Sequence, residues 1–311
     1  MSDFKHTAVL GAGVIGASWT ALFLASGRSV AVYDPSPQVE STIKATVEKS
    51  WPVLEQLGLT ENGNPDNLSF HKQAGDAVGD ALFIQENVPE QLDIKHALYR
   101  DIEAELHSDA VIASSASGLT LSEMQAGFNN PAPLVLGHPF NPPHLIPLVE
   151  VMGNDKTGSG VVEKAEAFYK AVGKVTIRVN KEVPGHVANR LQAAVWREAI
   201  HMMNSGVASV EDIDTAMWAG PGLRWAVMGP TMLFHLGAGD GGLKEFCERY
   251  SVSFNRWWDD LGELHLNPAI AEQLVAGVEQ ETKGASGTEL SAQRDAMLAA
   301  ILQATGNLRQ S

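Results

Sequence analysis

A histidine and a glutamate stand twelve residues apart in the stretch GHPFNPPHLIPLVEV, and each belongs to an apolar segment typical of a strand. Histidine can take a proton from an alcohol because its pKa lies near neutral pH. A carboxylate on the second ring nitrogen would fix the tautomer and stabilise the imidazolium. We therefore expect His138 to be a general base with Glu150 as its partner. A core histidine with satisfied hydrogen bonds is the alternative interpretation.

For the two side chains to meet, the chain has to turn back between two successive strands. Prolines stand at 139, 142, 143 and 147 in this segment, and their rings would stiffen the turn. Ligands of open α/β sheets bind at the carboxyl ends of the strands. We expect the pair to lie at that edge.

A glycine pattern near the start of the chain could hold a dinucleotide. Gly11, Gly13 and Gly16 form G-x-G-x-x-G between the apolar run TAVL and the helical stretch GASWTALFLAS. The three glycines would allow a tight turn, close approach of a pyrophosphate and close helix packing, while the helix N-terminus attracts the phosphates. Asp34 ends the next apolar run and would bind the ribose hydroxyls, which favours NAD over NADP. A glycine-rich turn of another α/β fold, with Asp34 merely solvated, is the alternative.

The elements that must position these residues alternate between strands and helices. The predicted fold is α/β, a Rossmann-type, doubly wound and mostly parallel sheet followed by an all-helical C-terminal domain. We expect strands at 7–10, 29–34, 81–86, 110–114, 133–137, 145–151 and 174–179, with helices at 16–26, 36–59, 92–106 and 160–172. Helices are expected at 187–206, 210–217, 230–236, 242–250 and after 268, and a loop at 282–293 before the last helix. The predicted domains are 1–182 and 183–311.

Composition limits the classes of partner and the compartment. The 311 residues carry a formal net charge of −15, which argues against nucleic acid because binding it requires a basic face. No apolar run reaches the roughly 18 residues of a membrane span. Cys247 is the only cysteine, which favours a reducing, cytoplasmic location; we interpret it as a packing residue. With no metal-binding cluster in the sequence, a dinucleotide cofactor indicates hydride transfer.

Five stretches make the sequence recognisable over nearly its whole length: VLGAGVIGASW, FIQENVPEQLDIKHALY, IASSASGLTLSEM, GHPFNPPHLIPLVEV and VPGHVANRLQAAVWREA. The chain resembles the 3-hydroxyacyl-CoA dehydrogenase family. The resemblance implies a Rossmann domain joined to a helical dimerisation domain, NAD as cofactor, and a homodimer.

The resemblance also implies roles for single residues. It places Ser117 and Asn189 at the reacting oxygen, and it assigns contacts with the cofactor to Asn141, Glu90 and Lys95. Each residue has a structural alternative. Ser117 could be a helix N-cap, Asn189 a residue of a helix surface, and Lys95 a solvated lysine.

The substrate is expected to be a small 3-hydroxy acid. The acyl-CoA members have a lysine-rich arm after the second strand, where this chain reads QVESTIKATVEKSWPVLEQLGL, and residues 218–242 are similar to a short, CoA-independent branch. This resemblance implies L-carnitine first, with L-gulonate or a 3-hydroxyacyl-CoA as alternatives. Arg224 could bind the carboxylate and Trp225 the quaternary ammonium, although tryptophans more often serve as core or interface residues. A crystallin-like structural protein that binds NAD is the non-enzyme alternative.

Overall fold

The computed structural model describes residues 4–309, and the chain divides into two compact units, Met1–Ala188 and Asn189–Ser311. The boundary predicted between residues 182 and 183 lies shortly before this division. Within the described residues, no helix is both long and apolar enough to cross a lipid bilayer.

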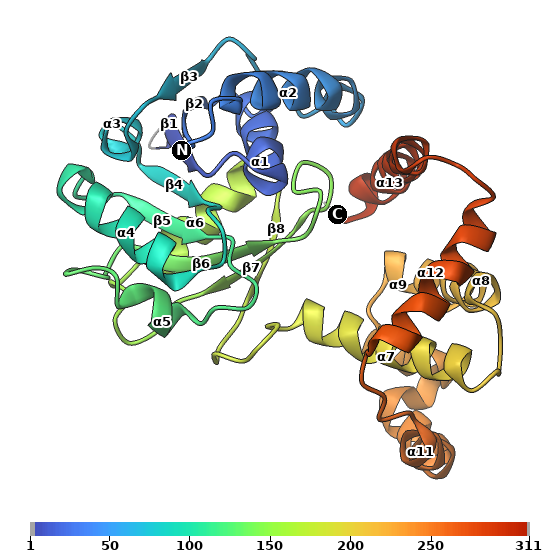
Figure 1. Ribbon diagram of the computed structural model, residues 1–311. Helices are drawn as coiled ribbons and strands as arrows, with labels where there is room; N and C mark the ends of the chain where they lie inside the picture. Colours follow the sequence, from blue (N-terminus) through green and yellow to red (C-terminus); the bar gives the residue numbers. More distant parts are fainter. Residues whose placement is uncertain (1–3, 310–311) are drawn as a thin grey trace. The chain divides into compact units, whose positions relative to one another are not determined.

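An eight-stranded sheet forms the centre of unit 1 (Figure 1). The strand order is β3-β2-β1-β4-β5-β6-β7-β8, and every neighbouring pair is parallel except β6 with β7. The first six strands have the order of the Rossmann fold, so the predicted fold class is confirmed. The strands are β1 (His6–Leu10), β2 (Ser29–Tyr33), β3 (Leu68–His71), β4 (Phe83–Glu86), β5 (Val111–Ser114), β6 (Leu134–Pro139), β7 (Leu148–Met152) and β8 (Val175–Arg178).

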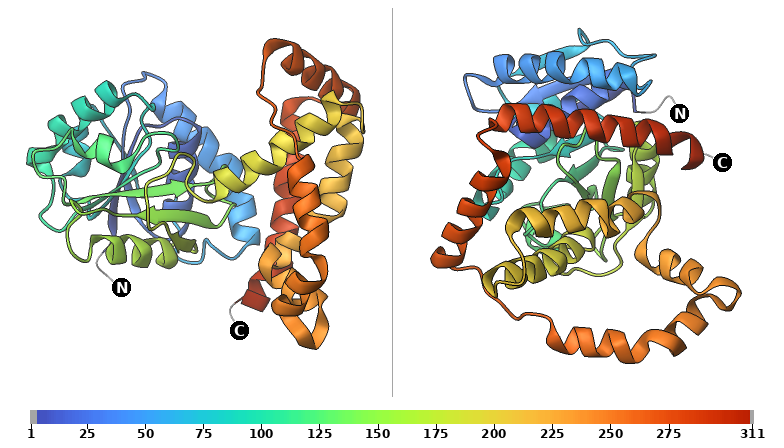
Figure 2. Two further views of the ribbon diagram at one scale, coloured as in Figure 1. Left: turned by 90° about the horizontal axis from the view of Figure 1, so that it is seen from below. Right: turned by 90° about the vertical axis from the view of Figure 1, so that its right-hand side faces the viewer.

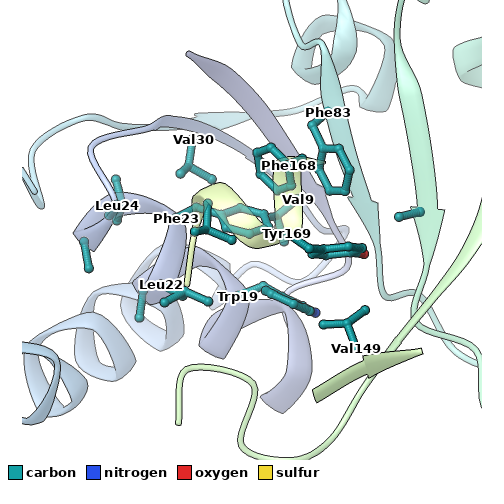
Figure 3. Close-up of a cluster of buried hydrophobic side chains, with 14 of the residues drawn as sticks. Val9, Trp19, Leu22, Phe23, Leu24, Val30, Phe83, Val149, Phe168 and Tyr169 are labelled. Atoms are coloured by element: carbon teal, nitrogen blue, oxygen red, sulfur yellow. The ribbon is translucent and has the colours of Figure 1, made fainter. Parts of the chain in front are cut away.

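Helices cover both faces of the sheet because successive strand side chains point to opposite sides. One face packs against α1 (Val14–Ala25), α2 (Val39–Gln56) and α6 (Val161–Ala171), and Figure 3 shows its cluster around Trp19, Phe83 and Phe168. The other face packs against α3 (Ala74–Val78), α4 (Leu92–Ile102) and α5 (Leu121–Gln125), with the 3-10 turn η1 (Glu103–Glu105) after α4. β3, α3 and α5 were not predicted, because four or five residues are too few to show a period.

Unit 2 consists of helices joined by loops (Figure 2), and the residues described beyond 188 contain no strand. Its helices are α7 (Ala188–Asn204), α8 (Val210–Ala219), α9 (Pro221–Val227), α10 (Pro230–Gly237), η2 (Gly239–Gly241), α11 (Gly242–Asp260), α12 (Pro268–Thr282) and α13 (Gly287–Arg309). A loop does lead into the last helix, but it is shorter than the predicted 282–293, since α12 ends at Thr282 and α13 begins at Gly287. α9 was not predicted because prolines and glycines surround it in the sequence.

Candidate active site

The structure brings His138 and Glu150 together. They are direct partners in the antiparallel register of β6 and β7, so the chain makes the expected return between two strands. Nδ1 of His138 lies 2.8 Å from Oε2 of Glu150, and both side chains are buried. The pair is therefore fixed by the sheet itself.

The second carboxylate oxygen of Glu150 is held by backbone. Oε1 accepts hydrogen bonds of 2.9 Å from the N–H groups of Val187 and Ala188, where α7 begins. Burial raises the pKa of Glu150, but the hydrogen bonds from His138, Ala188 and Val187 outweigh it, so this pKa lies below its ordinary value. An ionised carboxylate only accepts hydrogen bonds, which requires Nδ1 of His138 to donate. Nε2 then carries the lone pair that a general base needs.

The other candidates of unit 1 gather at the carboxyl ends of neighbouring strands. β1, β4, β5 and β6 are adjacent and parallel. Gly11 follows β1, Glu90 follows β4, Ser117 follows β5, and His138 lies near the end of β6. Parallel strands end at one edge of a sheet, so these four residues share that edge.

Glu90 holds the loop that carries Ser117. Its Oε1 accepts a hydrogen bond from the backbone N–H of Ser117, a second of 3.1 Å from the Ser117 hydroxyl, and a third of 3.0 Å from the N–H of Gly118. The N-cap of α5 is Thr120, in a capping box with Glu123, so the N-cap interpretation of Ser117 is wrong. The serine is positioned by a carboxylate from the loop that follows the neighbouring strand β4.

The glycine-rich turn leaves space where a phosphate would approach. Gly11 has a φ of +86°, which favours glycine, and a Cβ on Gly16 would lie only 1.8 Å from the carbonyl oxygen of Gly11. A Cβ on Gly13, the N-cap of α1, would meet nothing within 4 Å. Two glycines therefore shape the turn, and the third keeps the helix N-terminus open to an anion.

Asp34 is tied to the same turn. Its Oδ2 accepts a hydrogen bond of 2.7 Å from the N–H of Ala12, and its Oδ1 accepts one of 2.8 Å from the N–H of Ser36. The carboxylate stands directly after β2, beside the glycine turn that follows β1. Binding of a ribose by Asp34 stays a prediction.

Comparison with known proteins decides the family. Residues 6–183 match the family "3-hydroxyacyl-CoA dehydrogenase, NAD binding domain", and residues 185–274 match "3-hydroxyacyl-CoA dehydrogenase, C-terminal domain". The chain belongs to the 3-hydroxyacyl-CoA dehydrogenase family. It is 45% identical to an L-carnitine dehydrogenase of Nocardiopsis dassonvillei, over 96% of this chain and 91% of the relative. It is 44% identical to one of Streptomyces coelicolor, over 98% of this chain and 96% of the relative.

A solved structure resembles the whole chain. It is 5-formyl-3-hydroxy-2-methylpyridine 4-carboxylic acid 5-dehydrogenase, described as an NAD+ dependent dismutase, with a TM-score of 0.83 and 29% identity. The match covers 97% of this chain and 99% of that one. The 3-hydroxyacyl-CoA dehydrogenase fold therefore extends over both units.

The protein of this sequence is an NAD-dependent oxidoreductase of the 3-hydroxyacyl-CoA dehydrogenase family, and NAD is its cofactor. The open space at Gly13 and the anion-binding end of α1 fit the pyrophosphate of NAD. The carboxylate of Asp34 fits a ribose without a 2′-phosphate. The residues present therefore suit the group that the family binds.

Two alanine substitutions test two separate roles of the glycines. Gly16 allows the backbone geometry of the turn, and Gly13 leaves space for a phosphate. Gly16→Ala should lower both the melting temperature and NADH affinity, because its Cβ overlaps backbone. Gly13→Ala should fold normally and lose about tenfold in NADH affinity, equivalent to about 1.4 kcal/mol, because its Cβ fills space left for phosphate. Thermal melting and NADH titration by fluorescence measure both. A Gly16→Ala protein as stable as the parent would contradict the geometry.

Lys95 is fully buried, so its interpretation as a solvated lysine is wrong. Its Nζ donates 2.6 Å to Oε1 of Glu86 and 3.2 Å to the carbonyl oxygen of Val88. Glu86 also accepts from the hydroxyls of Tyr99 and Ser114. This network holds the turn between β4 and Glu90, and direct contact of Lys95 with NAD stays a prediction.

Sequence reasoning missed two residues of this edge. Oδ1 of Asn87 accepts a hydrogen bond of 2.7 Å from the hydroxyl of Ser115, which joins the ends of β4 and β5. His186 is buried, and its ring centroid lies 5.2 Å from that of His138. Asn87 could have been found because it directly follows a strand. His186 could have been noticed as a lone histidine after a Pro-Gly turn.

The remaining candidate site residues are exposed to solvent or half-buried. Asn141 is exposed after β6, Asn189 is half-buried in the first turn of α7, and Arg224 and Trp225 are exposed on α9. The cofactor and substrate roles of these residues stay predictions.

The tryptophans of unit 2 are between 39% and 66% exposed, so the core interpretation is wrong for them in the single chain: Trp196, Trp218, Trp225, Trp257 and Trp258. The packing interpretation of Cys247 is also wrong, because it is exposed.

Proposed function

We propose that this enzyme oxidises the 3-hydroxyl group of L-carnitine with NAD. The supporting observation is 44–45% identity with relatives named L-carnitine dehydrogenase over nearly the full length of both chains. Six further relatives with that name are 38–44% identical. The buried His138–Glu150 pair supplies the base that such an oxidation needs.

In the proposed reaction, Nε2 of His138 takes the proton of the substrate hydroxyl. Glu150 holds the ring through Nδ1 and stabilises the imidazolium that results. Bound NAD would supply the acceptor for the hydride that leaves the carbon carrying the hydroxyl. Ser117 binds the reacting oxygen as its bond to carbon changes.

Charge at α2 supports a substrate without CoA. A cavity between α2 and β3 is lined by Glu40, Glu48, Glu55 and Asp66, with Lys44 as the one cation among its lining residues. This excess of carboxylates would repel the phosphates of CoA. Arg224 and Trp225 would instead hold the carboxylate and the quaternary ammonium of carnitine.

A substrate panel tests the proposal. Purified enzyme with NAD should form NADH with L-carnitine, and much more slowly or not at all with L-gulonate and 3-hydroxybutyryl-CoA. Substrate-dependent NADH absorbance measures the reaction. If only the CoA ester is oxidised, the assignment to the CoA-independent branch is wrong. If no alcohol gives NADH, the crystallin-like structural alternative gains support.

We also propose that the protein is a cytoplasmic homodimer joined through unit 2. Four of its tryptophans are more than half exposed, as are Val207, Leu223 and Val252. So many exposed apolar side chains are typical of an interface. A reducing cytoplasm would keep the exposed Cys247 as a thiol. Sedimentation should give twice the mass of one chain, and a monomer at micromolar concentration would contradict the dimer.

A further inference from the structure

His186 adopts a backbone conformation that few side chains tolerate. Its φ is 49°, in the left-handed region, and it follows Gly185 at φ 74°. Such a residue costs free energy and persists where its surroundings hold it, often at functional sites. The side chain is 3% exposed, so the turn directs an imidazole into the interior of unit 1.

The contacts of the imidazole determine which nitrogen carries its hydrogen. Nε2 lies 3.4 Å from the carbonyl oxygen of Ala116, and a carbonyl can only accept, so Nε2 must donate. Nδ1 is then a buried acceptor, and it has no hydrogen-bond partner among the described residues. An unpaired buried acceptor lowers the stability of a folded protein, because the hydrogen bond that it made to water is lost. Stability alone therefore does not explain a histidine here.

Residues 186–188 form hydrogen bonds both with the residue before Ser117 and with Glu150, the partner of His138. His186 contacts Ala116, which directly precedes Ser117, and its ring lies 5.2 Å from the ring of His138. The N–H groups of the next two residues bind the carboxylate of Glu150. We propose that His186 is a positioning residue that holds the Ser117 loop against the base His138. This inference rests on the proposed function, in which both residues act on one substrate oxygen.

Burial and neighbouring charges keep the imidazole of His186 uncharged when His138 acts as the base. The groups that act on His186 are His138 from β6, Glu150 from β7 and Glu90 from the loop after β4. Burial lowers the pKa of His186 most, and the charge of His138 lowers it further, while the Ala116 carbonyl and the two carboxylates only partly offset these effects. When His138 accepts the substrate proton, His186 therefore stays neutral and keeps its bond to Ala116.

Two substitutions test the positioning role. His186→Phe keeps a ring but removes the donor, whereas His186→Gln keeps an N–H close to the position of Nε2. We expect His186→Phe to lower kcat for L-carnitine roughly 10- to 100-fold, with the KM for NAD nearly unchanged. His186→Gln should recover most of the loss. Wild-type kcat in His186→Phe, or no recovery in His186→Gln, would overturn the proposal.

A readout that needs no substrate separates this inference from the proposed function. In 15N-histidine NMR of the intact enzyme between pH 6 and 8, His186 should show a hydrogen on Nε2, and His138 a hydrogen on Nδ1. The spectra of His186→Gln and His138→Gln assign the two signals. A hydrogen on Nδ1 of His186 would refute the positioning bond. If both histidines show the expected tautomers but the enzyme does not oxidise L-carnitine, only the proposed substrate would be refuted.

Discussion

Replacing His138 with glutamine should lower kcat for L-carnitine by roughly 100- to 10,000-fold, the range that general acid–base catalysis supplies. Glutamine can occupy the same place between β6 and β7 and can still donate to Glu150. Its amide cannot take a proton at neutral pH. NADH affinity should not change, because the glycine turn that follows β1 stays intact. Steady-state kinetics and NADH titration measure the two quantities.

The exposed histidine His107 offers a matched control for this variant. It stands before β5, at the amino end of the strand and away from the carboxyl edge. His107→Gln should keep wild-type kcat. If His138→Gln also kept it, the base would have to be another residue. If His138→Gln lost NADH binding as well, the loss would reflect damage to the fold.

The contact between His138 and Glu150 could be predicted because its geometry is local. His138 and Glu150 lie on two strands joined by a short proline-rich return, and a residue type with a suitable pKa faces a carboxylate. The Rossmann sheet was equally predictable from the sequence, because its strands are apolar runs separated by segments with helical periodicity. The glycine pattern at Gly11, Gly13 and Gly16 then located the first turn at the carboxyl edge.

What the sequence could not predict depends on contacts between distant segments. The bond from His186 to Ala116 spans 70 residues, and the bonds from Glu90 to the Ser117 loop span 27 or more. No periodicity reports such contacts. Lys95 illustrates the same limit, since a lysine in an amphipathic helix suggests solvent until the buried Glu86 is known to face it.

Glu150→Gln should lower kcat by about 1,000- to 10,000-fold, although the change removes no atom from the base itself. In the wild type, Oε1 accepts two backbone N–H groups and Oε2 accepts from Nδ1 of His138. A glutamine has only one oxygen. If that oxygen keeps the backbone groups of Val187 and Ala188, its NH2 faces Nδ1 and forces the ring hydrogen onto Nε2. The nitrogen that should accept the substrate proton is then already occupied.

The pH dependence of stability supplies a second measurement on this variant. The pKa of Glu150 is lowered in the folded protein, so its carboxylate contributes stability above the unfolded pKa that is lost as pH falls through the folded pKa. Glu150→Gln should therefore lose less stability on acidification than the wild type. Chemical denaturation at neutral and acidic pH measures this difference. Equal acid sensitivity together with unchanged kcat would mean that Glu150 does not orient the base.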